Sequence, residues 1–490
     1  MNIDLCKTGL LLSFFFLCQV SSLPGQPLAF FYGTPDITEA GTKVAVDPEG
    51  NFLLTGQRFS FVDPGGSVPT NSDASVLKID PLGALLWSNH IDSTITDAAV
   101  SVIPRSANNQ VVLARSCEAL VSGVGCGQNN VRLYFLTNGG NVSNISDHYL
   151  GSNALPANFV ATPDGGFLIC GVTNTYSANS DIFVIKTNAV GEQEWEAIIP
   201  GTAPRAFDLV LANDGGCYVA GSSVESAGRV TLFSRISAEG SVQWVKYFGE
   251  AGFTGKMARI GSHFGLLLTN APTDFYGIEL YLLDTEGEVV WEKDLVGTMS
   301  RPTCLTGVDN GLVVGGLVET PSPNNKTARF AKYDLDGNLL WGRTHDPFPD
   351  FYERPTDIIP LPNGGLAVGG NTELPDSIAW VYPADLMLLL LDKEGQIDSV
   401  MINRIEEPAT LPVHVFPNPA QDRVVFDLTG IEGAARLQFL NSQGLLVGEH
   451  PISGHRPDIS LAAYPNGWYW FQIHSARGRL LGSGKLLLQR

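Results

Sequence analysis

The sequence contains few residue combinations that carry recognisable chemistry. None of its eight histidines forms an H-x-H, an H-E-x-x-H or a Cys/His cluster, so no metal site can be read from them. His90 and His345 each follow a tryptophan on a strand pattern, which favours surface polar positions over catalytic ones. The sequence also lacks the G-x-S-x-G pattern of a serine nucleophile. We therefore predict no catalytic residue, no metal ligand and no cofactor.

Two short segments look like ligand-binding loops, but their context favours turns. The segment 482–485 (GSGK) ends like a phosphate loop, yet Leu486 stands where such a loop needs Ser or Thr. The segment 334–338 (DLDGN) begins like a calcium loop but lacks the distal glutamate. Related segments elsewhere read Asp-Pro-Leu-Gly and Asp-Thr-Glu-Gly, which is typical of hairpin turns.

The beginning of the chain is typical of an exported protein. Residues 1–22 have a basic Lys7, an apolar core too short to span a membrane, and a final Val-Ser-Ser before a cleavage site. We predict a signal peptide here; a buried N-terminal strand is the alternative.

Cysteine usage agrees with export. Cys117 and Cys126 flank a glycine-rich segment, 118–125, which we expect to be a loop held by a disulfide in an oxidising compartment. Two unlinked thiols are the alternative. Three further cysteines fall on strand patterns and are expected to be small buried side chains. They are Cys170, Cys217 and Cys304.

Two signatures alternate along the chain. The first is a turn followed by a short apolar strand that ends in glycine, as at 49–56 and 164–171. The second is an apolar strand, a glycine turn and, in most copies, a tryptophan four residues later. Its glycines are Gly83, Gly139, Gly191, Gly240, Gly287, Gly337 and Gly395. Their spacings of 56, 52, 49, 47, 50 and 58 residues indicate a repeat architecture.

Each repeat predicts four short antiparallel strands separated by glycine turns. Helical periodicity is nearly absent. Seven such units arranged radially predict an all-β fold, a seven-bladed β-propeller at 23–404, because closure into a ring removes exposed sheet edges. Residues 28–33 resemble an outgoing strand and are expected to pair with the last blade, whose own copy at 397–404 is divergent.

The repeated tryptophans are interpreted as blade-packing residues that fill the wedge between adjacent sheets, with sugar stacking as the alternative. They are Trp87, Trp195, Trp244, Trp291 and Trp341. The Asp-x-x-Gly-x-x-x-Trp form at 80–87, 284–291 and 334–341 resembles the tryptophan-docking motif of quinoprotein-type propellers. The resemblance concerns blade packing and implies no quinone cofactor.

The tail differs from the repeats. Residues 405–412, with two acids and two prolines, predict a linker. Alternating apolar residues in 413–490 predict a small Ig-like β-sandwich.

Four motifs in the tail occur in a specific order. The segment 415–419 (VFPNP) with Asp422 is followed by 441–444 (NSQG), then by DIS at 458–460 and GWY at 467–469, and finally by KLLL at 485–488. The tail therefore resembles the type A C-terminal sorting domain of the type IX secretion system of Bacteroidetes; an ordinary Ig-like domain is the alternative. The matching motif residues are Pro417, Asn418, Pro419, Asp422, Gly444, Gly467, Tyr469 and Lys485. The resemblance implies export by the type IX machinery, followed by release or anchoring at the outer-membrane surface.

Charge and composition restrict the function. Acids outnumber bases by 50 to 30, a net charge of −20, which argues against a nucleic-acid partner. No internal apolar run reaches the roughly 20 residues of a transmembrane helix. The longest segments between strand cores, 57–74, 117–130 and 319–327, would shape a binding surface if they share one face.

The sequence thus predicts a secreted or cell-surface binding or adhesion module for an extracellular protein or glycan. One alternative is a propeller hydrolase or lyase that acts on polysaccharide, with carboxylates, or a carboxylate and a histidine, in the central channel. A purely structural surface protein is the other.

Overall fold

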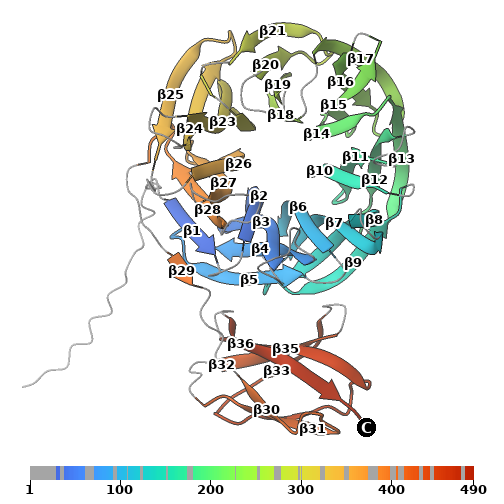
Figure 1. Cartoon of the computed structure of the whole chain (residues 1–490), viewed down its shortest axis with the longest axis vertical. Helices are drawn as coiled ribbons and strands as arrows, with labels where there is room; N and C mark the ends of the chain where they lie inside the picture. Colours follow the sequence, from blue (N-terminus) through green and yellow to red (C-terminus); the bar gives the residue numbers. More distant parts are fainter. Residues whose placement is uncertain are drawn as a thin grey trace, which may run out of the picture.

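The computed structural model describes residues 29–490, apart from 34–37, 61–70, 92–95, 107–108, 122–124, 151–152, 174–179, 227, 251–253, 270–277, 296–297, 300, 320–325, 347–351, 374–383, 398–403, 407–412, 430–433, 442–445 and 476–479. Within these residues the regular elements are all β-strands (Figure 1). The described part of the chain has no helix that is long and apolar enough to cross a membrane. The predicted signal peptide, residues 1–22, lies outside the described residues.

Strands β2 to β25 follow one another in antiparallel groups of four, each in sequence order. The first two groups are β2 (Thr38–Val46), β3 (Phe52–Ser60), β4 (Asn71–Ile79) and β5 (Leu85–Ile91), then β6 (Thr96–Ser106), β7 (Asn109–Val121), β8 (Gly125–Thr137) and β9 (Val142–His148). A single parallel pairing of Ser72 with Thr96 links these two groups. The next two are β10 (Leu155–Ala161), β11 (Phe167–Val172), β12 (Asp181–Thr187) and β13 (Gln193–Pro200), then β14 (Arg205–Leu211), β15 (Cys217–Glu225), β16 (Gly228–Ile236) and β17 (Val242–Glu250). They are followed by β18 (Thr254–Ile260), β19 (His263–Thr269), β20 (Ile278–Leu283) and β21 (Val289–Asp294), then β22 (Arg301–Val308), β23 (Gly311–Glu319), β24 (Lys326–Asp334) and β25 (Leu339–His345).

Both ends of the repeat region build the last sheet of the ring. Strands β26 (Tyr352–Pro360), β27 (Leu366–Glu373) and β28 (Ala384–Leu391) are completed by the N-terminal strand β1 (Ala29–Gly33), which runs antiparallel to β28. The expected pairing of residues 28–33 with the last repeat is therefore found for Ala29 to Tyr32. The short strand β29 (Arg404–Glu406) then pairs in parallel with β1.

The predicted linker boundary is wrong at its first two residues. Ile405 and Glu406 were expected to begin a linker, but both pair with β1 as part of β29. The free edge of β1 presents unpaired backbone groups, and this segment satisfies some of them.

The first strands of the groups lie around the centre of the molecule (Figure 1). They contact one another in a closed cycle that runs β2, β6, β10, β14, β18, β22, β26 and back to β2. Sheets that share a central axis in this way, with their first strands innermost, form a β-propeller. The apolar cores lie between neighbouring sheets: one buried cluster contains Leu53 and Val76 of the first group together with Val112 and Tyr134 of the second.

Asx-type turns connect the third and fourth strands of most groups. In one of them Asp80 Oδ1 accepts hydrogen bonds from the amides of Leu82 and Ala84, and Gly83 has φ of 84°. The second repeat departs from the prediction by one residue. There Gly140, not Gly139, has the positive φ of 80°, because the turn closes between Thr137 and Gly140.

The segment 118–125 is not the loop that was expected. Strand β7 continues to Val121 and β8 starts at Gly125, so the two strands extend as a long hairpin. Similarly, β3 and β4 pair as far as Ser60 and Asn71. The described residues at both ends of these predicted excursions are thus paired strand, since cross-strand hydrogen bonding continues beyond the sheet core.

The tail folds into two sheets that share one core. The smaller contains β30 (His414–Phe416), β31 (Arg423–Asp427) and β34 (Asp458–Ser460). The larger contains β33 (Leu446–Pro451), β32 (Ala434–Leu440), β35 (Gly467–Ser475) and β36 (Leu480–Leu488). Phe426 of the smaller sheet packs edge-on against Phe471 of the larger one, with ring centroids 5.0 Å apart.

Candidate binding site in the central cavity

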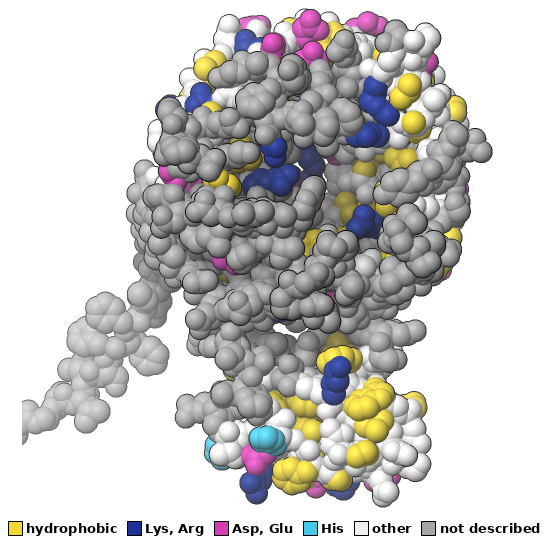
Figure 2. Space-filling view, viewed as in Figure 1, with side chains coloured by type: hydrophobic (Ala, Val, Ile, Leu, Met, Phe, Trp, Pro, Cys, Tyr) yellow, Lys and Arg dark blue, Asp and Glu magenta, His cyan; other side chains and the backbone are white. Residues whose placement is uncertain are grey.

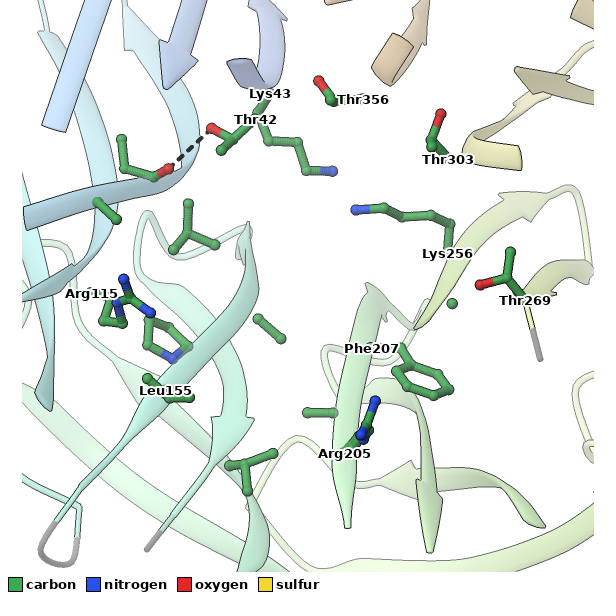
Figure 3. Close-up of a pocket in the computed structure, with 18 of the residues that line it drawn as sticks. Thr42, Lys43, Arg115, Leu155, Arg205, Phe207, Lys256, Thr269, Thr303 and Thr356 are labelled. Atoms are coloured by element: carbon green, nitrogen blue, oxygen red, sulfur yellow. Dashed lines mark hydrogen bonds between the residues drawn. The ribbon is translucent and has the colours of Figure 1, made fainter. Parts of the chain in front are cut away.

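A cavity of about 810 Å³ lies at the centre of the ring (Figure 3). Its wall is built from the starts of the first strands and from the ends of some second strands, such as Gln57 of β3 and Thr269 of β19. The hairpins between the second and third strands begin at these same ends. The cavity therefore opens on the face that carries the extended β3–β4 and β7–β8 hairpins.

A bulge near the start of most first strands shapes the wall. On β2 the pairing with β3 skips from Gly41 to Lys43, which leaves Thr42 as the extra residue. Bulges re-aim side chains locally. The extra residues on the bulged strands all line the cavity: Thr42, Val100, Ala157, Phe207, Thr303 and Thr356.

The wall is cationic. Five bases from five different strands line the cavity, and none of the described lining residues is acidic. These bases are Lys43, Arg115, Arg205, Lys256 and Arg354. Figure 2 shows Lys and Arg side chains around the hollow at the centre of the ring, while acidic side chains appear mainly toward the outer edge. A chain with a net charge of −20 thus concentrates positive charge at its axis.

Lys43 lies at the junction between the first and last sheets. Its ammonium donates to Asp357 Oδ1 at 3.1 Å, and the amide of Val44 donates to Asp357 Oδ2 at 3.2 Å. Burial opposes the charge of Lys43, but Asp357 and Asp208 outweigh burial, so the pKa of Lys43 is raised. This pair therefore closes the ring and keeps Lys43 protonated.

Lys256 projects from β18 into the same space. Figure 3 shows the Lys43 and Lys256 side chains pointing toward one another across the cavity. No described residue forms an ion pair or hydrogen bond with the Lys256 ammonium. Burial lowers the pKa of Lys256, and the positive charge of Lys43 lowers it further.

Two carboxylates that directly follow lining residues in the chain join neighbouring first strands. Asp208 on β14 accepts from the Asn158 amide of β10 at 2.5 Å and from the backbone amide of Met257 on β18 at 3.0 Å. Asp357 likewise joins β26 to β2, because it accepts a hydrogen bond from the backbone amide of Val44. These two carboxylates hold the wall together from behind the lining.

The blade-packing tryptophans contact the turn of the following sheet. A Cβ placed on Gly240 would lie 2.7 Å from the Trp195 ring, and the Trp195 Nε1 donates to the Ala238 carbonyl at 3.0 Å. A Cβ placed on Gly140 would likewise contact the Trp87 ring, and one placed on Gly337 would contact the Trp291 ring. The last two pairs are Trp244 with Gly287 and Trp341 with Gly395.

The predicted cysteine positions divide into two groups. Cys117 is buried and disulfide-bonded. The side chain of Cys126 lies outside the described residues, so its pairing with Cys117 remains a proposal. The three other cysteines of the described chain are free and buried, as expected; they are Cys170, Cys217 and Cys304.

His345 is less exposed than expected, because its Nε2 lies 2.6 Å from the Gly395 carbonyl in the next turn. Burial lowers the pKa of His345. This histidine belongs to blade packing, far from the cavity lining.

The sorting-motif residues of the tail attach its last strand to its beginning. The Asn418 side chain donates to the Lys485 carbonyl at 3.1 Å and accepts from the Leu487 amide at 2.9 Å. Asp422 accepts from Arg490 at 3.0 Å, and the Tyr469 hydroxyl donates to the Pro465 carbonyl at 2.7 Å. Pro417 and Pro419 flank Asn418, Gly467 starts β35, and Gly444 lies outside the described residues.

Residues 414–484 match the family described as the secretion system C-terminal sorting domain. The tail is a type IX sorting domain. It indicates export through the type IX secretion system to the extracellular space or the cell surface. The sorting domain thus has the secretion machinery as its partner.

No curated protein is similar enough in sequence to match the chain. Among solved structures, the polysaccharide lyase Uly1 has a TM-score of 0.47 at 12% identity and covers 72% of this chain and 90% of its own. The β-propeller domain of the Trilobed protease from Pyrococcus furiosus has 0.43 at 8%, covering 72% and 93%. Cobalt-substituted Synechocystis ACO has 0.40 at 12%, covering 76% and 95%. These similarities are weak and carry no functional argument.

Sequence reasoning missed the cationic lining, although a signal was present. The segments Arg301-Pro302-Thr303 and Arg354-Pro355-Thr356 repeat at the starts of two first strands. Aligning the repeats at these starts, instead of at the glycine turns, would have brought Arg205, Arg301 and Arg354 into one column, of which Arg205 and Arg354 line the cavity. Repeated positions at the inner end of each sheet face the axis.

Proposed function

We propose that the chain is a seven-bladed β-propeller followed by an Ig-like sorting domain, and that it serves as an extracellular binding module. Each group from β2–β5 to β22–β25 would be one blade, and the sheet of β26–β28 with β1 would be the seventh. A signal peptide at residues 1–22 would start its export from a cell of the Bacteroidetes lineage.

The observation that supports binding is the cationic wall of the central cavity. Ligand pockets of about 300–1,000 Å³ are the usual size for small-molecule sites, and this cavity of about 810 Å³ falls within that range. Its polar groups are amines, guanidinium groups and hydroxyls, all of which bind oxygen-rich ligands. We propose that the ligand enters from the face with the extended hairpins.

A polysaccharide hydrolase or lyase remains the second candidate of the sequence. Such an enzyme would use acid and base groups at the axis. Asp208 and Asp357, which directly follow the lining residues Phe207 and Thr356, are occupied by backbone amides of neighbouring strands. We therefore place binding first and include cleavage in the test.

The test is a glycan and protein array probed with the full exported protein, with a parallel assay for hydrolysis or elimination. Ala157→Trp places an indole on the cavity wall, and Leu82→Trp adds the same ring to an exposed turn as the control. We expect ligands that Ala157→Trp loses and Leu82→Trp keeps. Ligands that both variants bind equally would contradict a site in the cavity, and shortening of the ligand would support the enzyme.

A further inference from the structure

We propose that Lys43 and Lys256 form a two-ammonium subsite for the oxyanion of an acidic polysaccharide, a sugar carboxylate or sulfate ester. The inference rests on the proposed function, because it assumes that the cavity is the binding site. It adds the chemical class of the ligand and the residues that select it.

The charges of the two lysines are unequally balanced. Lys43 and Lys256 extend toward each other from β2 and β18, on separate sheets of the ring. Asp357 balances one of the two charges, and no described residue pairs with the other. Like charges at close range in a partly enclosed site repel one another, so an anion placed between them gains attraction from both.

Threonine hydroxyls line the cavity on the same part of the wall as the lysines. Thr42 donates its hydroxyl hydrogen to the Ala99 carbonyl at 3.0 Å, the dashed line in Figure 3, and accepts from the Thr55 hydroxyl at 3.0 Å, which leaves one lone pair. Thr303 donates to the Pro355 carbonyl, and Thr356 to the Gly369 carbonyl at 3.3 Å. A hydroxyl whose hydrogen is used in this way still has a free lone pair.

These hydroxyls therefore act as acceptors toward a ligand. The ligand that fits must carry oxyanions for the lysines and O–H groups for the threonines. An acidic sugar carries its oxyanion and several O–H donors on the same ring, whereas the donors of an acidic polypeptide are backbone N–H groups separated from the carboxylate by a flexible side chain. The combination favours an acidic polysaccharide over an acidic polypeptide.

The cationic wall extends beyond the lysine pair. Arg115 on β7 and Arg205 on β14 lie on other parts of the lining from the lysine pair (Figure 3). A polymer with an acidic group on successive sugars would place one oxyanion between the lysines and others near these arginines. Guanidinium groups bind planar carboxylates and sulfates through two parallel hydrogen bonds.

The experiment measures the affinity of the full exported protein for matched pairs of polymers. Polygalacturonate is compared with its methyl-esterified form, and a sulfated galactan with its desulfated form. Poly-glutamate serves as the acidic polypeptide. We expect roughly tenfold or greater preference for one acidic polysaccharide over its neutral form. The arm that binds identifies the oxyanion as carboxylate or sulfate.

Two variants locate the effect. Lys256→Met removes the unpaired charge and keeps a long side chain, and we expect it to weaken binding roughly tenfold. Lys393→Met is the matched control, because it also removes one charge but from a side chain that is 72% exposed on an outer turn. Thermal melting of both variants verifies that they are folded.

Each outcome decides between the two proposals. Equal binding of the acidic and neutral polymers, equal binding of poly-glutamate, or full affinity in Lys256→Met would overturn the lysine subsite. A neutral ligand that Ala157→Trp nevertheless abolishes would leave the cavity as a binding site and reject only the acidic ligand. An acidic polysaccharide that Ala157→Trp binds normally would reject both.

Discussion

At the scale of single residues, Lys256 is the most informative position in the molecule. Its ammonium is held in the cavity without an ion pair to a described residue and faces a second lysine. Such a charge weakens the fold unless a ligand compensates it. Its presence is therefore easier to explain by binding than by stability.

We predict that Lys256→Met stabilises the unliganded protein, by on the order of 1 kcal/mol at neutral pH. Burial and the positive charge of Lys43 lower the pKa of Lys256. Asp208, Asp357 and Cys304 act in the opposite direction, but their effect is smaller, so the pKa is lowered overall. Because the folded pKa lies below the ordinary lysine pKa of 10.5, the unfolded chain binds more protons in the interval between them, and wild-type stability rises with pH there.

The advantage of Lys256→Met should accordingly be full below the folded pKa and disappear as pH approaches and passes 10.5. Denaturant unfolding at a series of pH values measures this difference. A variant that is less stable than wild type at neutral pH would show that the ammonium has a stabilising partner.

At the scale of elements, the ring depends on contacts between each sheet and the next turn. The indole of Trp195 rests on Gly240 of the following sheet, where φ is +84°. Gly215 lies in another turn of that same sheet with φ of +88°, and a Cβ there would meet only the Ala238 methyl at 3.6 Å. Substitution of either glycine therefore introduces backbone strain, but only substitution of Gly240 also introduces a contact with the tryptophan ring.

We predict that Gly240→Ala destabilises the propeller by about 2–4 kcal/mol, since it combines left-handed strain with overpacking. Gly215→Ala should cost only about 1–2 kcal/mol from strain alone. Urea unfolding of both variants gives the comparison. Equal losses would mean that the tryptophan does not fill the space between sheets.

At the scale of the whole molecule, the ring is closed by contacts between residues far apart in the chain. Asp357 of β26 holds Lys43 and Val44 of β2, and β1 pairs with β28. The hydroxyl of Tyr32 on β1 donates to the Gly83 carbonyl at 3.0 Å, in the turn after β4. Closure therefore joins the first and last sheets at both inner and outer strands.

We predict that Tyr32→Phe lowers stability by about 1–2 kcal/mol, because it leaves the Gly83 carbonyl without its buried partner. Tyr247→Phe removes a hydroxyl from a side chain that is 46% exposed and should change stability little. Thermal unfolding compares the two. A loss no greater for Tyr32→Phe than for the control would argue against closure through β1.

The sequence predicted the strand-rich repeat and the tail because local chemistry determines both. Glycines at positive φ, such as Gly83 and Gly337, and the VFPNP motif are visible in a few residues. The cavity could not be predicted in this way, because Lys43 and Lys256 are over two hundred residues apart in the chain and meet only when the ring closes. The sequence did not show which of the adjacent Gly139 and Gly140 has the positive φ, because either glycine is compatible with the turn.

The most direct measurement is protection of individual lysines from an amine-acylating reagent, read by mass spectrometry of the full exported protein. Burial and Lys43 lower the pKa of Lys256, so at a given pH its amine is neutral, and open to acylation, in a larger fraction of molecules than an ordinary lysine amine. We predict that an acidic polysaccharide protects Lys43 and Lys256 and leaves the labelling of Lys393 unchanged. Binding of that polysaccharide with undiminished labelling of Lys256 would contradict it.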